Sequence, residues 1–391
     1  DIFPQDESKI SIDANFKITP SCNENNINMK KNSKKKQLSL ENDLGESYYS
    51  QNKSTSKSGN GCTGSNGGKN PSSGPCRSKN RDNSPSTPSP HSEKPKYSVT
   101  KKVKYKACFT QVGFDGQQDK EFNQDTYQIF ENFADNPEYL YVVVCDGHGD
   151  YGHLVSDFIQ RFLPKTLSHL LSRVDIQNET ARMNQIIVNS FIEINNKLNS
   201  DYINTTFSGT TCCSVIFTPN KLICPNLGDS RAVLGRYINS HWESYDLTRD
   251  HKPGDEDEAE RIIENGGIIV PLCENGQFVG PKRIWVELNE FPGLAMSRSF
   301  GDEIAHTVGV SPVPEIKVRN FQGNEKFLII ASDGIWEFID SEECVHIVKK
   351  YYEEGKNIKA AVKNLVEEAF KRWRKEEETV DDITAVIIFF E

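Results

Sequence analysis

The sequence predicts an α+β fold in which antiparallel β-sheets are packed between layers of helices, and three observations lead to this prediction. Short β-rich runs recur from about Val99 to the C-terminus, mostly as neighbouring pairs with no helix between them. A few segments show helical periodicity, and each has one apolar stripe, so each helix covers a single face. Neighbouring strands favour antiparallel pairing, whereas a parallel Rossmann-type sheet would alternate strand and helix.

The predicted strands are short runs rich in β-branched and aromatic residues. They are YQIF (127–130), LYVVVC (140–145), TTCCSVIFT (210–218), KLICPNLG (221–228), RAVLGRY (231–237), FLIIASD (327–333) and TAVIIFF (384–390). The third and fourth runs meet at the turn residues TPN (218–220), which predicts that these two strands form a hairpin.

Amphipathic helices are predicted where apolar residues recur with a period near 3.6. These segments are 153–173, 181–199, 257–267, 341–354 and 357–375. Ser341, followed by two Glu, is a favourable helix start, and Gly266 with Gly267 is a favourable stop. Together with the strands, the helices predict one layered α+β domain over residues 98–391, a length that one sandwich of sheets can accommodate.

Residues 1–97 form a separate, low-complexity extension. The stretch from Ser50 to Tyr97 is rich in Ser, Gly, Asn, Lys and Pro and has almost nothing to bury, so we expect the extension to be disordered. It carries 15 Lys and Arg against 10 Asp and Glu, which leaves 31 against 46 for residues 98–391. The folded part is therefore acidic, which argues against a nucleic-acid surface and suits a site that gathers cations.

Cysteine usage and apolar content indicate the compartment. The ten cysteines are irregularly spaced and include no CxxC pair, which argues against a zinc ribbon, a redox motif or a disulfide framework. No apolar run approaches the ~20 residues of a membrane span, and the first residues show no signal-peptide pattern. We therefore expect a reduced intracellular chain, in the cytoplasm or the nucleus, with no transmembrane segment.

Aspartates recur at the ends of the predicted strands. They are Asp125 before TYQIF, Asp146 after YVVVC, Asp229 between two strands, Asp333 after FLIIAS, and Asp381 with Asp382 before the last strand. Carboxylates gathered at one sheet edge would repel one another unless a cation neutralised them, and oxygen-only ligands select hard cations such as Mg²⁺ or Mn²⁺. The pattern predicts a metal site that activates water against phosphate; ordinary turn-capping aspartates are the alternative.

Seven segments stand in the order seen in one known family. They are VVVCDGHGDYG, FSGTTCCSVIF, NLGDSRAVLG, LTRDHKP, PGLAMSRSFGD, ASDGIWEFI and DDITAVII. Through them the region from about Ala107 to Glu391 resembles the metal-dependent protein phosphatases of the PP2C (PPM) type. The resemblance implies a layered α-β-β-α fold, a central antiparallel β-sandwich flanked by helices. It also implies that the substrates are phosphoproteins, whose phosphoserine and phosphothreonine are hydrolysed by a water or hydroxide bridging two Mg²⁺ or Mn²⁺ ions.

The same resemblance implies a set of metal ligands. Asp146 would bridge both metals, and Gly147 would bind one of them through its backbone carbonyl. Asp333 and Asp381 would complete the shell of one metal. Asp125, next to Gln124 in FNQDTY, would hold metal-bound water.

Three more positions take roles from the resemblance. Asp229, in GDSR, would bind a weaker third metal ion shared with Asp333, although Glu337 replaces an Asp that is frequent in relatives. His148 corresponds to the proposed general acid that protonates the leaving oxygen, and an ordinary histidine pKa of about 6.5 suits that work. Lys120 matches a position where many members carry a phosphate-binding Arg. A Lys there keeps the positive charge but loses the bidentate geometry.

Several residues near these motifs invite simpler interpretations. Asp382 replaces an Asn that is frequent next to Asp381, and it could compete as a ligand, although a DD pair is also seen in similar sequences. His251, in RDHKP, is expected to brace its loop. The acidic run GDEDEAE (254–260) is expected to be a favourable helix start and nothing more. The cysteines at positions 145, 212 and 213 are expected to be small buried hydrophobic residues.

Two rival functions remain open on sequence alone. One is a catalytically dead relative that binds phosphoproteins as a scaffold, which the complete set of metal ligands argues against. The other is a metal-dependent hydrolase of small phosphate compounds, which the segment PGLAMSRSFGD argues against. For the phosphatase we expect a monomer.

Overall fold

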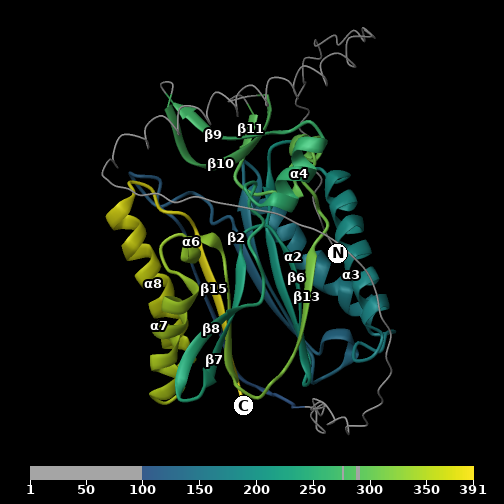
Figure 1. Ribbon diagram of the computed structural model, residues 1–391, viewed down its shortest axis with the longest axis vertical. Helices are drawn as coiled ribbons and strands as arrows, with labels where there is room; N and C mark the ends of the chain where they lie inside the picture. Colours follow the sequence, from purple (N-terminus) through teal and green to yellow (C-terminus); the bar gives the residue numbers. More distant parts are fainter. Residues whose placement is uncertain (1–98, 275–276, 288–290) are drawn as a thin grey trace, which may run out of the picture. The chain divides into compact units, whose positions relative to one another are not determined.

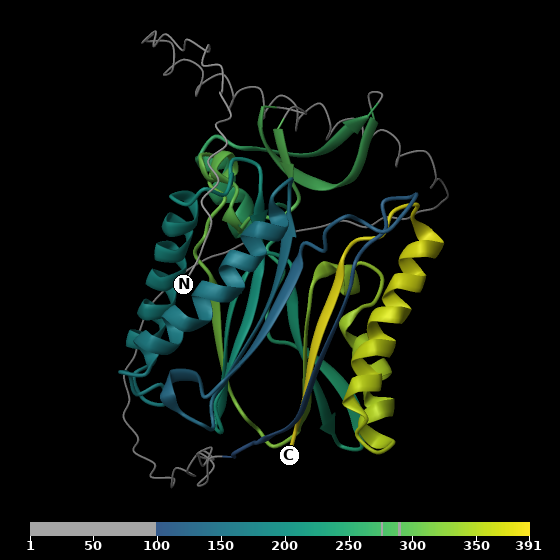
Figure 2. The same ribbon diagram turned by 180° about the vertical axis from the view of Figure 1, so that it is seen from behind.

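The computed structural model describes residues 99–274, 277–287 and 291–391, and two β-sheets packed face to face form its centre (Figure 1). In the described ranges, the first sheet has five antiparallel strands in the order β1-β15-β14-β7-β8. Their bounds are β1 Val103–Gln111, β15 Ile383–Phe390, β14 Glu325–Ala331, β7 Arg231–Ile238 and β8 His241–Asp246. Figure 2 shows β1 beside β15, so the two ends of the folded domain pair with each other.

The second sheet has seven strands within the described part, in the order β12-β4-β3-β5-β6-β13, with β2 pairing to β3. Their bounds are β12 Phe300–Gly301, β4 Gly209–Thr210, β3 Leu140–His148, β5 Cys212–Phe217, β6 Lys221–Leu227, β13 Glu315–Asn320 and β2 Asp125–Glu131. All of these pairs are antiparallel. The predicted hairpin is confirmed, since β5 pairs with β6 and the Thr218 amide donates to the Lys221 carbonyl at 3.0 Å.

Helices cover the outer face of each sheet, which confirms the predicted α-β-β-α layers (Figure 1). The helices α2 (Gly152–Leu171) and α3 (Thr180–Asn199) share one buried core with the seven-stranded sheet. The helices α7 (Ser341–Glu353) and α8 (Ile358–Glu376) share another with the five-stranded sheet. The shorter helical segments are η1 Phe133–Asp135, α4 Glu256–Glu264, α5 Glu303–His306 and α6 Asp333–Trp336.

The central strands explain why the sequence shows continuous apolar runs. In β3, Val142 and Val144 pack in the core between the two sheets, whereas Tyr141, Val143 and Cys145 pack toward α2 and α3. Both faces of the strand are therefore buried, and the usual alternation of apolar and polar residues disappears.

A third, smaller sheet was not predicted from the sequence. It consists of β9 Ile268–Glu274, β10 Gln277–Glu287 and β11 Phe291–Leu294, in the order β11-β10-β9. Figure 1 shows it at one end of the sandwich, opposite the end where the C-terminus lies. It packs with α4 on a small core that includes Ile262, Ile284 and Met296.

The predicted elements recur with boundary shifts of up to three residues, and the strand predicted over 210–218 is divided into β4 and β5. Two of the shifts have a clear local cause. The strand predicted over 327–333 ends at Ala331, and Asp333 instead begins α6 after Ser332, whose extended backbone precedes the helix. The helix predicted over 257–267 ends at Glu264, because Gly266 adopts a left-handed φ of 89°. The disordered extension predicted for 1–97 lies outside the described residues. In the described ranges no helix has the length and hydropathy needed to cross a membrane.

Candidate active site

Strand pairing brings the first two predicted ligands face to face. Asp125 is the first residue of β2 and lies opposite Asp146, near the end of β3. The contact continues one residue further, where the Gly147 amide donates to the Gln124 carbonyl at 3.1 Å. Both carboxylates therefore stand at one edge of the seven-stranded sheet.

Three chain connections bring the other predicted acids to the same end of the sandwich, and two of these connections adjoin strands of the five-stranded sheet. Asp229 follows β6, Asp333 begins α6 just after β14, and Asp381 precedes β15. Ser332, which precedes Asp333, donates a hydrogen bond to Asp125 Oδ2 at 2.6 Å, so the two sheets meet at these acids. Burial raises the pKa of Asp146 well above its ordinary value, and charge repulsion from the other four carboxylates raises it further. The fold thus gathers five acids that the sequence had only suggested as a group.

This carboxylate cluster carries more negative charge than a buried site stabilises alone. Burial raises the pKa of Asp125 to about 7, although a hydrogen bond from Ser332 Oγ at 2.6 Å acts in the opposite direction. The pKa of Asp333 is also well above its ordinary value, first through burial and then through repulsion from neighbouring carboxylates. Protons or cations must offset the repulsion.

The donor atoms of the cluster fit a hard divalent cation. The Oδ1 atoms of Asp125, Asp229 and Asp333 are buried and accept no hydrogen bond, whereas buried oxygens normally have a partner. Carboxylate oxygens without sulfur or imidazole ligands are the donor set that Mg²⁺ and Mn²⁺ prefer. Within the described ranges, no three His, Cys, Asp or Glu side chains are already closed around a space for an ion.

Two lysines neutralise the outer carboxylates of the cluster. Lys120 Nζ lies 2.5 Å from Asp381 Oδ1, and Lys252 Nζ forms an ion pair with Asp229 Oδ2. Burial lowers the pKa of each lysine, but the nearby carboxylates outweigh it, so both pKa values are raised and both side chains are charged. Lys252 was not predicted as a site residue from the sequence. Its position in the segment LTRDHKP was the one feature that could have indicated it.

Asp382, the neighbour of Asp381, braces the backbone. Its Oδ1 accepts the Gly113 amide at 2.6 Å, and its Oδ2 accepts the Gln124 amide at 2.9 Å. Asp382 therefore holds the loop before β2 in place, a use that the competing-ligand interpretation did not foresee.

Gly147 must be glycine because β3 meets the start of α2 there. A Cβ atom at Gly147 would lie 2.3 Å from the Gly152 carbonyl oxygen and 2.7 Å from the Gln124 carbonyl oxygen. Both contacts are with backbone, so any side chain would push β2 or α2 away from β3. The close backbone approach agrees with a role for the main chain at this corner.

His148 is held by an aspartate that was not singled out from the sequence. Its Nε2 lies 2.7 Å from Asp302 Oδ2, which also accepts a hydrogen bond from Ser299 Oγ at 2.5 Å. Burial lowers the pKa of His148, but the ion pair with Asp302 outweighs burial, so the net shift is upward. The Nδ1 atom of His148 is buried and has no hydrogen-bond partner. The imidazolium is thus stabilised at one nitrogen and available at the other.

Comparison with known proteins identifies the family. The family model for protein phosphatase 2C matches residues 111–377. The chain belongs to the protein phosphatase 2C family. The "Probable protein phosphatase 2C 35" of Arabidopsis thaliana is 31% identical over 285 residues, covering 69% of this chain and 79% of the relative. The "Probable protein phosphatase 2C 72" of the same plant is 32% identical over 281 residues, covering 70% and 82%.

Solved structures agree with this PP2C assignment at the level of the fold. A serine-threonine phosphatase 2C from Toxoplasma gondii superposes with a TM-score of 0.63 at 21% identity, covering 73% of this chain and 94% of that one. A sex determining protein of C. elegans gives a TM-score of 0.58 at 18% identity, covering 74% and 65%. Membership in the PP2C family makes the chain a metal-dependent protein serine/threonine phosphatase, whose substrates are phosphoproteins.

A buried acid holds together the PP2C segments on one side of the site. Glu258 is fully buried and accepts hydrogen bonds from Arg298 Nη2 at 2.5 Å, Arg261 Nη2 at 2.6 Å and Ser297 Oγ at 2.6 Å. Burial alone would raise its pKa, but these partners lower it far below the ordinary value. The acidic run 254–260 therefore does more than begin a helix, because Glu258 ties α4 to the segment that carries Asp302.

Other interpretations of the PP2C motifs are confirmed. His251 is buried, and its Nδ1 accepts the Gly228 amide at 3.1 Å, so it braces the loop beside Asp229. The cysteines at positions 145, 212 and 213 are fully buried in the sheets. Burial raises the pKa of the Cys212 and Cys213 thiols, which keeps them protonated and unreactive.

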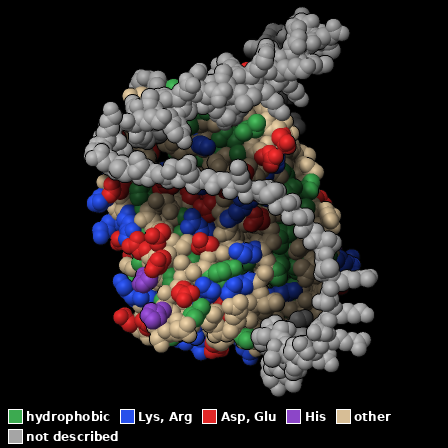
Figure 3. Space-filling view, in the orientation of Figure 1, with side chains coloured by type: hydrophobic (Ala, Val, Ile, Leu, Met, Phe, Trp, Pro, Cys, Tyr) green, Lys and Arg blue, Asp and Glu red, His purple; other side chains and the backbone are tan. Residues whose placement is uncertain are grey.

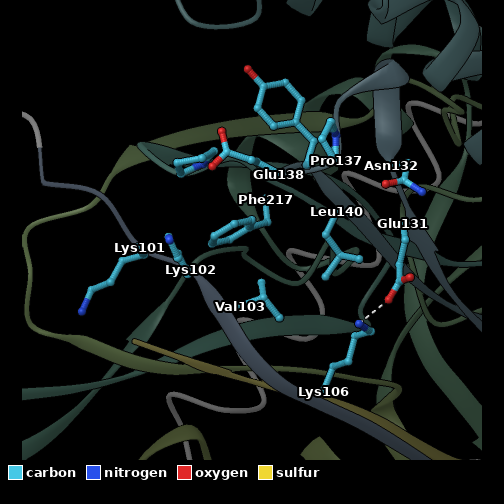
Figure 4. Close-up of a pocket in the computed structure, with 12 residues that line it drawn as sticks. Lys101, Lys102, Val103, Lys106, Glu131, Asn132, Pro137, Glu138, Leu140 and Phe217 are labelled. Atoms are coloured by element: carbon cyan, nitrogen blue, oxygen red, sulfur yellow. Dashed lines mark ion pairs between the residues drawn. The ribbon is translucent and has the colours of Figure 1, made fainter.

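Away from the carboxylates, a hollow of about 380 Å³ opens between β1, the start of β3 and the β5–β6 hairpin (Figure 4). Three lysines line it, but Lys106 forms an ion pair with Glu131, and Lys101 Nζ donates to the Gly323 carbonyl at 3.4 Å. Much of its positive charge is therefore engaged within the protein. The face drawn in Figure 3 likewise shows Lys and Arg interspersed with Asp and Glu, and no continuous basic surface.

Proposed function

We propose that this phosphatase works with two Mg²⁺ or Mn²⁺ ions held in the carboxylate cluster. Asp146 would contact both ions, the Gly147 carbonyl would contact one of them, and Asp333 with Asp381 would complete one shell. Asp125 would act through water. When bound, such ions lower the pKa of water and so supply a nucleophile for phosphorus at neutral pH.

One observation carries this proposal. The buried Oδ1 atoms of Asp125, Asp229 and Asp333 have no hydrogen-bond partner, and repulsion between the carboxylates adds to burial in raising the pKa values of Asp146 and Asp333. A protein that only bound phosphoproteins as a scaffold would gain nothing from this arrangement, which destabilises the fold unless cations are bound.

His148 would donate the proton that the leaving oxygen requires. Hydrolysis breaks the bond between phosphorus and the serine or threonine oxygen, which leaves as an alkoxide unless it receives a proton. Asp302 binds Nε2 and favours the charged imidazolium. We assign the transferred proton to Nδ1, because that nitrogen has no partner within the protein.

The two lysines would act differently. Lys120, beside Asp381, supplies positive charge for the phosphate oxygens as a point charge. Lys252 already neutralises Asp229, so an ion at Asp229 must compete with an ammonium group. We therefore propose that a third ion binds there more weakly than the other two. The five acids and His148 come from a single chain, which supports a monomer as the active form.

The test is hydrolysis of a phosphothreonine peptide with Mn²⁺, with EDTA, and by Asp146→Asn and Asp333→Asn variants. We expect activity only with Mn²⁺. In both variants the activity should fall about 100-fold or more, because the loss of an oxygen ligand weakens the binding of the ions. Isothermal titration should find two strong Mn²⁺ sites. Activity in EDTA or in both variants would contradict the two-metal proposal, and faster hydrolysis of small phosphate esters would favour the rival hydrolase. His148→Gln should lower turnover while Mn²⁺ affinity stays intact.

A further inference from the structure

Four large apolar side chains are exposed in the segments that flank the candidate active site. Phe122, Tyr151, Leu154 and Phe207 are 50%, 42%, 37% and 51% exposed, respectively. We call these four residues the apolar rim. Single exposed apolar residues are common on protein surfaces, but several of them in segments beside a reactive site indicate an interaction surface.

Three residues of the apolar rim stand close in the chain to strands or residues of the candidate active site. Phe122 precedes β2 and Phe207 precedes β4, and both of these strands pair with the end of β3. Gly209, two residues after Phe207, is the direct partner of His148. Tyr151 lies three residues after His148 in the chain, immediately before α2. Strand pairing therefore places Phe122 and Phe207 within a few residues of Asp125 and His148.

Contacts with other aromatic rings hold two of the rim rings, and a backbone hydrogen bond holds the start of α2 beside them. The Phe122 ring stacks on His153 with 4.5 Å between ring centroids and 8° between ring planes. The Phe207 ring lies edge-on to Phe291 at 5.9 Å. The Tyr151 amide donates to Ser208 Oγ at 3.0 Å, which joins the start of α2 to the segment that carries Phe207. Rings fixed on one side and open on the other can bind apolar groups with little loss of side-chain entropy.

The charges near the rim limit which ligands fit. Glu121 and Asp150 are both exposed and adjoin Phe122 and Tyr151 in the chain. Acidic side chains beside a phosphorylated residue would be repelled here, whereas apolar side chains would be accepted. An extended peptide advances ~3.3 Å per residue, so residues one or two positions from the phosphoresidue lie within ~7 Å of it along the peptide.

We propose that the apolar rim binds the side chains beside the phosphoresidue, so that this phosphatase prefers phosphoprotein segments in which apolar residues flank the phosphoserine or phosphothreonine. This inference rests on the proposed function, because the rim meets such a segment only if the carboxylate cluster is the reacting site. It names a class of substrate sequence that the metal chemistry alone does not select.

The experiment compares three phosphothreonine peptides that differ only in the residues adjacent to phosphothreonine, which are Leu, Ala or Asp. With Mn²⁺ we expect kcat/KM to fall in that order, with a Leu to Ala ratio of about tenfold, the low end of what an apolar contact contributes to specificity. A non-hydrolysable phosphonate version of each peptide, titrated calorimetrically, should give the same order of affinity. A Leu to Ala ratio near one would overturn the inference.

Rim variants test the assignment to these residues. In Phe122→Ala/Phe207→Ala the Leu to Ala ratio should fall close to one, and the ratio cancels any general loss of activity. Tyr151→Ala should lower the ratio by itself about threefold, and it serves if the double variant does not fold. Tyr237→Ala, 42% exposed on β7, is the matched control and should keep the wild-type ratio.

Two results would count against the rim even with a preference for Leu peptides. One is a Leu to Ala ratio of kcat/KM that is retained in both rim variants. The other is self-association of the protein that the rim variants abolish, which would mean that a second copy of the chain binds the apolar rim. Failure to hydrolyse any of the peptides with Mn²⁺ would instead refute the proposed function, so the two failures are distinguishable.

Discussion

The contact between His148 and Asp302 makes a quantitative prediction. Asp302→Asn removes the negative charge 2.7 Å from His148 Nε2 but leaves a side chain of the same size. Hydrogen bonds to charged groups contribute ~1.5–3 kcal/mol, and each ~1.36 kcal/mol is a factor of ten. Because the lost contact favours the protonated imidazolium, the pKa of His148 falls in the variant. We expect kcat/KM to drop about 10- to 100-fold on the alkaline side of the pH profile.

The sign of the pH effect separates this role from a purely structural one. The acid form of His148 is retained at low pH in both proteins, so the loss should shrink as pH falls, and the alkaline limb should move to lower pH. The assay is kcat and KM for a phosphothreonine peptide from pH 6 to 9 at saturating Mg²⁺, with Mg²⁺ affinity measured separately. Asp150→Asn, an exposed acid two residues from His148, is the control and should keep the wild-type profile.

Two outcomes would refute this reasoning. In one, the activity of Asp302→Asn falls equally at all pH values. In the other, only Mg²⁺ affinity changes. Either result would mean that Asp302 supports the loop and does not set the protonation of His148.

Four further predictions concern other charged residues in and around the carboxylate cluster. The pKa of Asp125 is raised to about 7, so in EDTA its protonated form contributes stability that is complete below the ordinary Asp pKa and is lost as pH rises through 7. The melting temperature in EDTA should therefore fall between pH 5.5 and 8, and an unchanged melting temperature would contradict this. Asp146→Asn should melt higher than wild type in EDTA but gain less from Mn²⁺ in thermal-shift measurements. Glu258→Gln should lose about 3 kcal/mol of unfolding free energy in urea, whereas the exposed Glu256→Gln should lose less than about 0.5 kcal/mol. Lys120→Ala should raise KM for the phosphopeptide about tenfold and Lys120→Arg should not, and equal effects would exclude a role of its charge.

The strands buried on both faces could be predicted because their composition leaves few alternatives. The run LYVVVC has no polar face and must lie between two layers, as β3 does. The strands that were missed are partly exposed ones, such as β8 with HWESYD and β13 with EIKVRN. In these strands polar residues dominate, so their pairing depends on neighbours that are distant in the chain.

The predicted ligands and their unpredicted partners show the same division. Asp146 and Asp333 are recognisable because an acid follows an apolar run within a family motif. Asp302 and Glu258 stood in segments that were also noted, yet nothing local indicates that one meets His148 and the other meets three arginines. Such partners come from elements that pack together only in the folded domain.

The sequence by itself determined the family, the layered fold and the acids available for metal binding, because residue order and local periodicity are enough to specify them. Only the tertiary structure decided which atoms of those acids lack partners, which lysines neutralise them, and which apolar side chains remain exposed in the segments that flank the site. Burial, pKa values and contact distances depend on how segments far apart in the chain pack, and no local pattern encodes that packing.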